Sequence, residues 1–272
     1  MPEDPLINDP AGGLPRLREI MRRLRAPDGG CAWDLEQDFD SIAPYAIEEA
    51  HEVADAIARR DWPGLRGELG DLLFQVVYHA QMAEEAGHFT LDDVIRDAGD
   101  KMVSRHPHVF GDAAARTAEA QTAAWEEQKA RERAARAQTG VLDDVPLALP
   151  ALMRAVKLQK RAARVGFDWP DMGQVVDKIA EEARELAEAR DTLPPDSVAE
   201  EMGDLLFVMA NLARHLKVDP EVALRAANDK FTRRFHAIEA ALAAQGRRPE
   251  DSTLEEMDAL WDAAKADERR SG

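Results

Sequence analysis

The most constraining feature of this sequence is an acidic pattern that occurs twice, the second copy starting 133 residues after the first. Each copy reads Glu-Glu-x-x-Glu and then, inside an apolar run, Glu-x-x-Asp. The acidic positions, which keep one offset, are Glu48, Glu49, Glu52, Glu68 and Asp71, then Glu181, Glu182, Glu185, Glu201 and Asp204. A pattern repeated at this length indicates an internal duplication and predicts two similar domains.

Both domains are expected to be helical. Ala, Leu, Glu and Arg dominate the sequence, and no alternating β-branched run is bounded by turn residues. Helices are predicted over 14–25, 41–60, 64–86, 91–105, 117–137, 150–164, 173–191, 196–216, 220–245 and 253–268. The predicted fold class is therefore all-α, with two tandem helical bundles joined by a charged helical and Pro-containing linker. The expected limits are a disordered N-terminus over 1–13, domains over 14–130 and 151–272, and the linker over 131–150.

Composition narrows the range of partners. The chain has 53 acidic and 35 basic residues and a net charge of -18, so bulk charge does not favour nucleic acid. No apolar stretch approaches the roughly 20 residues of a membrane span, and the first residues lack the regions of a signal peptide. The single cysteine, Cys31, excludes an internal disulfide and suits a reducing compartment. We expect a cytoplasmic protein with neither nucleic acid nor membrane as a partner.

The Glu-x-x-Asp element predicts carboxylates that face into the protein or a cleft. Apolar residues around Glu68 and Asp71 cover nearly every direction of the helix, and the second copy is more apolar still. A helix that is apolar all round is expected to be buried. Two carboxylates about 5 Å apart repel by roughly 3 kcal/mol at an effective dielectric of ~20, so several together call for a cation. Oxygen ligands without a nearby cysteine favour Mg²⁺ or Mn²⁺.

Basic and aromatic residues follow each acidic pattern at corresponding places. Each of the following pairs stands one helical turn apart: Lys101 and Arg105, Lys230 and Arg234, Trp125 and Lys129, and Trp261 and Lys265. Metal ligands, cations and an aromatic ring together are typical of a site for a nucleotide polyphosphate.

At these residues the chain resembles the MazG family of nucleoside triphosphate pyrophosphohydrolases, in its two-domain form. The resemblance covers Cys31 to Trp261 and includes the strings at 66–71, 105–110, 165–169 and 228–231. It implies a homodimer built from helical bundles and a dependence on Mg²⁺. It also implies cleavage of a nucleoside triphosphate to the monophosphate and pyrophosphate.

Carried onto matching positions, the resemblance implies a set of site residues in the second copy. The metal ligands would be Glu182, Glu185, Glu201 and Asp204. The residues lining the nucleotide and its phosphates would be Lys178, Glu181, Lys230, Arg233, Arg234, Trp261 and Lys265. A metal-activated water would attack the α-phosphorus, and Glu181 is our hypothesis for its base. The matching first-copy set is Glu49, Glu52, Glu68 and Asp71, with Lys101 and Arg105 as phosphate contacts.

The two copies differ in their cations. Lys178, one turn before Glu182, stands where the first copy has Tyr45. Lys230 is followed by two arginines, whereas Lys101 is followed by Ser104 and one arginine. The second copy therefore has more contacts for a triphosphate, and we expect it to be the main catalytic one.

Three other interpretations stay open at the level of sequence. A carboxylate-bridged di-iron oxidase would use Glu-x-x-His, which occurs at Glu48 with His51 and at Glu85 with His88. The chain can also be a non-catalytic acidic scaffold with a protein partner, or a nucleotide-sensing module that does not hydrolyse its ligand. Neither the base nor the sugar preference follows from the sequence.

Overall fold

The computed structural model describes residues 4–112, 114, 117, 120–121, 124–125, 128 and 140–271. All regular elements in this part of the chain are helices, which confirms the all-α class. The fold divides into two compact units, Met1–Gln128 and Lys129–Gly272. Residues 131–139 of the expected linker, and most of the helix expected over 117–137, lie outside the described residues.

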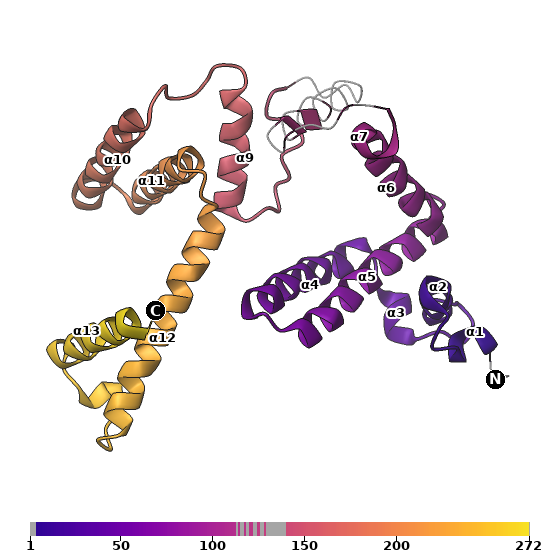
Figure 1. Ribbon diagram of the computed structural model, residues 1–272, viewed down its shortest axis with the longest axis horizontal. Helices are drawn as coiled ribbons and strands as arrows, with labels where there is room; N and C mark the ends of the chain where they lie inside the picture. The colour runs from indigo at the N-terminus through magenta and orange to yellow at the C-terminus, as the bar shows by residue number, and fades with distance from the viewer. Residues whose placement is uncertain are drawn as a thin grey trace. The chain divides into compact units, whose positions relative to one another are not determined.

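The first unit is built around a long helical hairpin. Its helices are α1 (Pro5–Asn8), α2 (Gly13–Leu24), α3 (Ala32–Glu36), α4 (Phe39–Arg59), α5 (Trp62–Glu85), α6 (Leu91–Arg105) and α7 (Pro107–Phe110). Helices α4 and α5 lie side by side (Figure 1). The side chain of Asp38 caps α4 and that of Asp61 caps α5, which fixes where the two helices begin. Tyr78 and Met82 of α5 pack with Met21 of α2 in the core of the unit.

The N-terminal segment differs from the disordered stretch expected over 1–13. Asp4 accepts a hydrogen bond from the backbone of Leu6 at 2.8 Å and caps the short helix α1. Arg23 forms an ion pair with Asp4, and Arg16 donates to the carbonyl of Ile7 at 2.7 Å. These contacts tie the segment to α2, and the run of prolines and glycines in the sequence did not reveal them.

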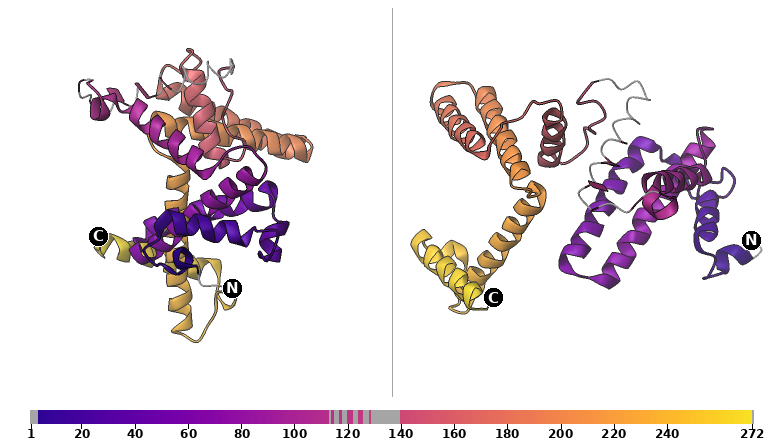
Figure 2. Two further views of the ribbon diagram at one scale, coloured as in Figure 1. Left: turned by 90° about the vertical axis from the view of Figure 1, so that its right-hand side faces the viewer. Right: turned by 45° about the horizontal axis from the view of Figure 1, so that its top comes forward.

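The second unit repeats the hairpin and adds a long arm. Its helices are α9 (Ala151–Ala163), α10 (Met172–Thr192), α11 (Pro195–His215), α12 (Pro220–Ala243), η1 (Pro249–Asp251, a 3-10 helix) and α13 (Leu254–Ser271). Helices α10 and α11 form the hairpin, and α9 packs against α11 with Ala155, Val156 and Ala210 buried between them. Helix α12 extends from this group, and α13 folds back beside it (Figure 2).

The expected burial of the Glu-x-x-Asp helices was wrong for a single chain. The second half of α5 is buried, but Leu69 and Leu73 beside its acids are 50% and 45% exposed. Along α11, Leu206 and Phe207 are 48% and 40% exposed. These helices are as apolar as the sequence indicates. Which faces of each helix are covered depends on packing, which composition does not specify. In the described part of the chain, no helix combines the length and the hydropathy needed to span a membrane.

Candidate functional site

The hairpin of the second unit brings three acids of the second copy together. Glu182 comes from α10, and Glu201 and Asp204 lie one turn apart on α11. One carboxylate oxygen from each residue lies within 4.8 Å of the other two. Two oxygens that share one Mg²⁺, at about 2.1 Å each, are at most about 4.2 Å apart. Small side-chain movements therefore suffice for the three to share a divalent ion.

The electrostatics of the group favour a positive charge close to its carboxylates. Burial raises the pKa of the Glu201 carboxyl above its ordinary value, and the negative charges of Glu185, Glu182 and Asp204 raise it further. Glu185 thus acts on the group without belonging to the three oxygens within 4.8 Å of one another. A cation bound among these carboxylates would reverse the shift, because it would favour their ionised forms.

Lys178 supplies a cation next to the group. Its Nζ lies 2.8 Å from an oxygen of Glu181 and 2.7 Å from an oxygen of Glu182. These contacts raise the pKa of the Lys178 ammonium, and Lys178 in turn lowers the pKa of the exposed Glu181. Glu182 is only 4% exposed, so its charge depends on this lysine or on a metal.

The first unit has the corresponding acidic group without the lysine. Oxygens of Glu49 on α4 and of Glu68 and Asp71 on α5 lie within 4.8 Å of one another. Burial raises the pKa of Glu68, and so does Glu52, whose carboxylate is both a charged neighbour and a hydrogen-bond partner. Tyr45, at the position that corresponds to Lys178, is 41% exposed.

The remaining predicted contacts of the second copy gather on α12 and α13. Glu268 receives hydrogen bonds from Arg234 at 2.7 Å and from Arg233 at 3.3 Å. The guanidinium of Arg234 lies 5.3 Å from the ring centre of Trp261, and so does the ring of Phe231. Sequence reasoning did not select Glu268, although it stands seven residues after Trp261 on the same helix face.

The structure does not join this second cluster to the acidic group. Among the described residues, no hydrogen bond or ion pair links the acids of α10 and α11 to Lys230, Arg233, Arg234 or Lys265. In the first unit, the carbonyl oxygen of Arg105 accepts a hydrogen bond from the Trp125 ring at 2.9 Å, and Lys101 is exposed. Lys129 lies outside the described residues.

The arrangement of the described residues does not support the di-iron interpretation. Where the structure describes the chain, neither acidic group includes a histidine. Glu85 is instead paired with Arg25 at 2.8 Å. The two Glu-x-x-His triplets therefore do not assemble the mixed ligand set that such an oxidase needs.

The fold and the two acidic groups define a class of helical proteins in which a helical hairpin occurs twice, and each hairpin gathers carboxylates that could hold a metal ion. The MazG nucleotide pyrophosphohydrolase domain matches this chain twice, over residues 37–110 and 173–238. The two matches cover α4 to α7 and α10 to most of α12. The chain belongs to the MazG family.

Three relatives are similar in sequence to this chain over more than nine-tenths of its length. The nucleoside triphosphate pyrophosphohydrolase of Escherichia coli (strain K12) is 52% identical over 94% of this chain and 98% of its own length. The nucleoside triphosphate pyrophosphohydrolase/pyrophosphatase MazG of Thermotoga maritima is 44% identical over 92% of this chain and 94% of its own length. Protein YabN of Bacillus subtilis (strain 168) is 45% identical over 94% of this chain, which matches 52% of that protein.

Proposed function

We propose that this protein is a Mg²⁺-dependent hydrolase that cleaves ribo- and deoxyribonucleoside triphosphates to monophosphates and pyrophosphate. Mn²⁺ is the expected substitute metal. The observation that carries the proposal is the group of Glu182, Glu201 and Asp204, whose oxygens lie within 4.8 Å of one another in a member of this family. The activities named for the Escherichia coli and Thermotoga maritima relatives support the same reaction.

The carboxylates of Glu182, Glu185, Glu201 and Asp204 would hold the metal. When bound, a divalent ion neutralises phosphate oxygens and lowers the pKa of a coordinated water. Lys178 lowers the pKa of Glu181, which favours its ionised form, and contacts Glu182 as well, so Glu181 is the proposed base that takes the proton of the attacking water. The water oxygen adds to the α-phosphorus, the bond from that phosphorus to the bridging oxygen breaks, and pyrophosphate leaves.

The α12 and α13 residues would hold the substrate. Lys230, Arg233, Arg234 and Lys265 would present positive charge to the departing pyrophosphate, and Lys178, now paired with Glu181 and Glu182, would be a further cation beside the phosphates. Trp261 would stack on the nucleoside. Because α12 and α13 form an arm, closing the site requires this arm to approach the acidic group of the same chain or of a second copy.

We also propose that the protein is a cytoplasmic homodimer and that it has no nucleic-acid partner. The exposed apolar residues of α5 and α11 support the dimer, because large apolar patches mark interfaces. The net charge of -18 supports the absence of a nucleic-acid partner.

The first test separates the two acidic groups. Purified protein is incubated with each of the eight common nucleoside triphosphates and Mg²⁺, with pyrophosphate resolved from phosphate. We expect pyrophosphate release that Glu201→Ala reduces by at least about a thousandfold, because a metal ligand is lost. Glu68→Ala, the matched change in the first unit, should retain most of the activity. The opposite result would move the active site to the first unit, and tight nucleotide binding without pyrophosphate would indicate a sensing module.

The second test concerns Glu181. We expect Glu181→Gln to lower kcat by about a hundredfold or more with little change in KM, because it removes the proton acceptor but keeps the shape. Glu188→Gln, on the same helix and exposed, is the matched control. Full turnover by Glu181→Gln at saturating Mg²⁺ would eliminate Glu181 as the base.

A further inference from the structure

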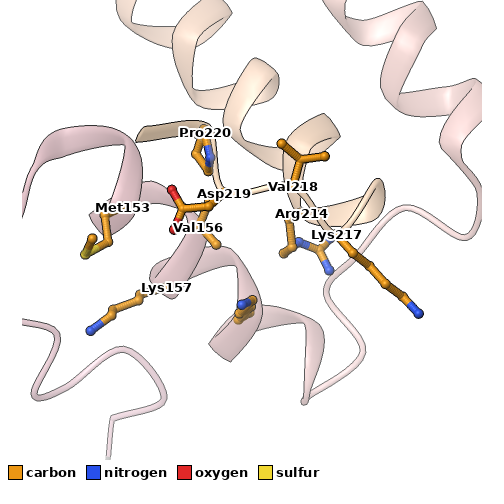
Figure 3. Close-up of a pocket in the computed structure, with 9 residues that line it drawn as sticks. Met153, Val156, Lys157, Arg214, Lys217, Val218, Asp219 and Pro220 are labelled. Atoms are coloured by element: carbon orange, nitrogen blue, oxygen red, sulfur yellow. The ribbon is translucent and has the colours of Figure 1, made fainter. Parts of the chain in front are cut away.

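The second unit has a pocket that the proposed reaction does not use. It has a volume of about 450 Å³ and lies between α9, the end of α11 and the start of α12 (Figure 3). Four apolar residues, four cations and one acid line it: Met153, Val156, Val218 and Pro220; Lys157, Lys160, Arg214 and Lys217; and Asp219. None of them belongs to the acidic groups or to the α12 and α13 cluster.

Two of the charged residues that line the pocket, Arg214 and Asp219, are already bonded to other parts of the chain. Arg214 forms an ion pair with Asp168 from the loop before α10. Asp219 is the N-cap of α12, and its Oδ1 accepts from the backbone nitrogens of Glu221 at 2.9 Å and Val222 at 3.2 Å. The negative charge of Asp219 is therefore directed to the end of its own helix.

The three lysines have no such partners. Within the described ranges, no hydrogen bond or ion pair involves the ammonium of Lys157, Lys160 or Lys217. Lys157 and Lys160 stand three residues apart on one face of α9, where like charges repel. In Figure 3 the side chains of Lys157 and Lys217 extend from opposite sides of the pocket, with their ammonium groups pointing away from each other. Flexible stems allow both ammonium groups to reach a ligand between them.

Three of the lysines that the structure describes without an ion-pair partner line this one pocket, although the chain has 53 acidic and 35 basic residues. An anion would relieve their repulsion, and Lys binds phosphate as a point charge. The pocket volume falls within the roughly 300–1,000 Å³ of small-molecule sites. We propose that this pocket binds a diphosphate or triphosphate group, free as pyrophosphate or carried by a nucleotide whose base contacts the apolar wall.

This binding differs from that at the acidic group in its need for metal. Three ammonium groups neutralise a phosphate without a divalent ion, whereas the carboxylates of α10 and α11 repel phosphate unless a metal is present. Binding of pyrophosphate in EDTA therefore does not arise at the acidic group, and its loss in variants of the pocket lysines distinguishes this pocket from the cations of α12 and α13. It does not depend on whether the proposed hydrolysis is correct.

The test is isothermal titration of the full chain with pyrophosphate, and separately with ADP, in EDTA at low ionic strength. The variants are Lys157→Gln with Lys160→Gln, and Lys217→Gly. Lys217 has a φ of +57°, and Gly87, Gly166 and Gly246 take the left-handed position after other helices. Glycine therefore suits this backbone, and Lys217→Gly should not destabilise the fold. The charge-matched control is Arg225→Gln with Arg269→Gln, which removes two exposed cations outside the pocket.

We expect one pyrophosphate per chain, with binding weakened at least about tenfold in each lysine variant and less than about twofold in the control. Tighter binding of ADP than of pyrophosphate would show that the apolar wall contacts the nucleoside. Equal affinity would make the phosphate group the whole ligand. Absence of binding by the wild type, unchanged affinity in the lysine variants, or an equal loss in the control would overturn the proposal.

Discussion

At the residue scale, the environment of Glu182 separates the second copy from the first. Its side chain is 6% exposed, and Lys178 at 2.7 Å is the cation that balances its charge. The position in the first copy that corresponds to Lys178 is occupied by Tyr45, which carries no positive charge. The sequence revealed this difference because it is a difference of residue type at one offset. It did not reveal that Lys178 would bind both Glu181 and Glu182, since those contacts depend on rotamers.

The pairing predicts that metal can replace Lys178. We expect Lys178→Met to lower the free energy of unfolding in EDTA by about 1–2 kcal/mol, because a buried carboxylate loses its partner while the partly exposed lysine limits the cost. Mg²⁺ should restore the stability of the variant more than it raises that of the wild type. Chemical denaturation with and without Mg²⁺ measures this, and Tyr45→Phe is the control. Equal Mg²⁺ effects on variant and wild type would contradict the prediction.

At the element scale, helix positions followed from the sequence more closely than helix burial did. The helix expected over 173–191 is α10, Met172–Thr192, and Asp171 caps it through the backbone nitrogen of Gln174. Capping residues and apolar periodicity act within a few residues, so they can be read locally. The long arm of α12 and α13 was not foreseen. Its shape depends on contacts such as that of Arg247 with Glu256, nine residues apart across a turn.

This contact predicts a pH dependence for the arm. Hydrogen bonds from Arg247 and Ser252 lower the pKa of Glu256 from 4.5 to about 2. A lowered pKa in the folded state contributes stability above pH 4.5, and that contribution disappears as the pH falls towards 2. We therefore expect Glu256→Gln to speed proteolysis between α12 and α13 at neutral pH. The stability difference from the wild type, followed by thermal unfolding, should vanish near pH 2. A difference that is independent of pH would contradict the role of the pair.

At the scale of the whole molecule, a single chain leaves apolar residues beside its acidic groups exposed. Leu206 and Met209 are 48% and 46% exposed on α11, and a Cβ added to Gly203 would meet no atom within 4 Å. Leaving such a face in water costs roughly 25 cal/mol per Å² of apolar surface relative to burying it. A single sequence shows that these positions are apolar, but it contains no information on which copy of the chain covers them.

The proposed homodimer predicts that a charge on one side of α11 prevents association. We expect the wild type to elute as two chains of 30.1 kDa, and Leu206→Glu to shift it to one chain, because a charge at a packed interface is left without a partner. Light scattering after size-exclusion chromatography measures the mass. Leu254→Glu, at a residue that is 75% exposed on α13, should leave the dimer intact. If Leu206→Glu keeps the mass and activity of the wild type, this face of α11 faces solvent, and the arm must then reach the acidic group of its own chain.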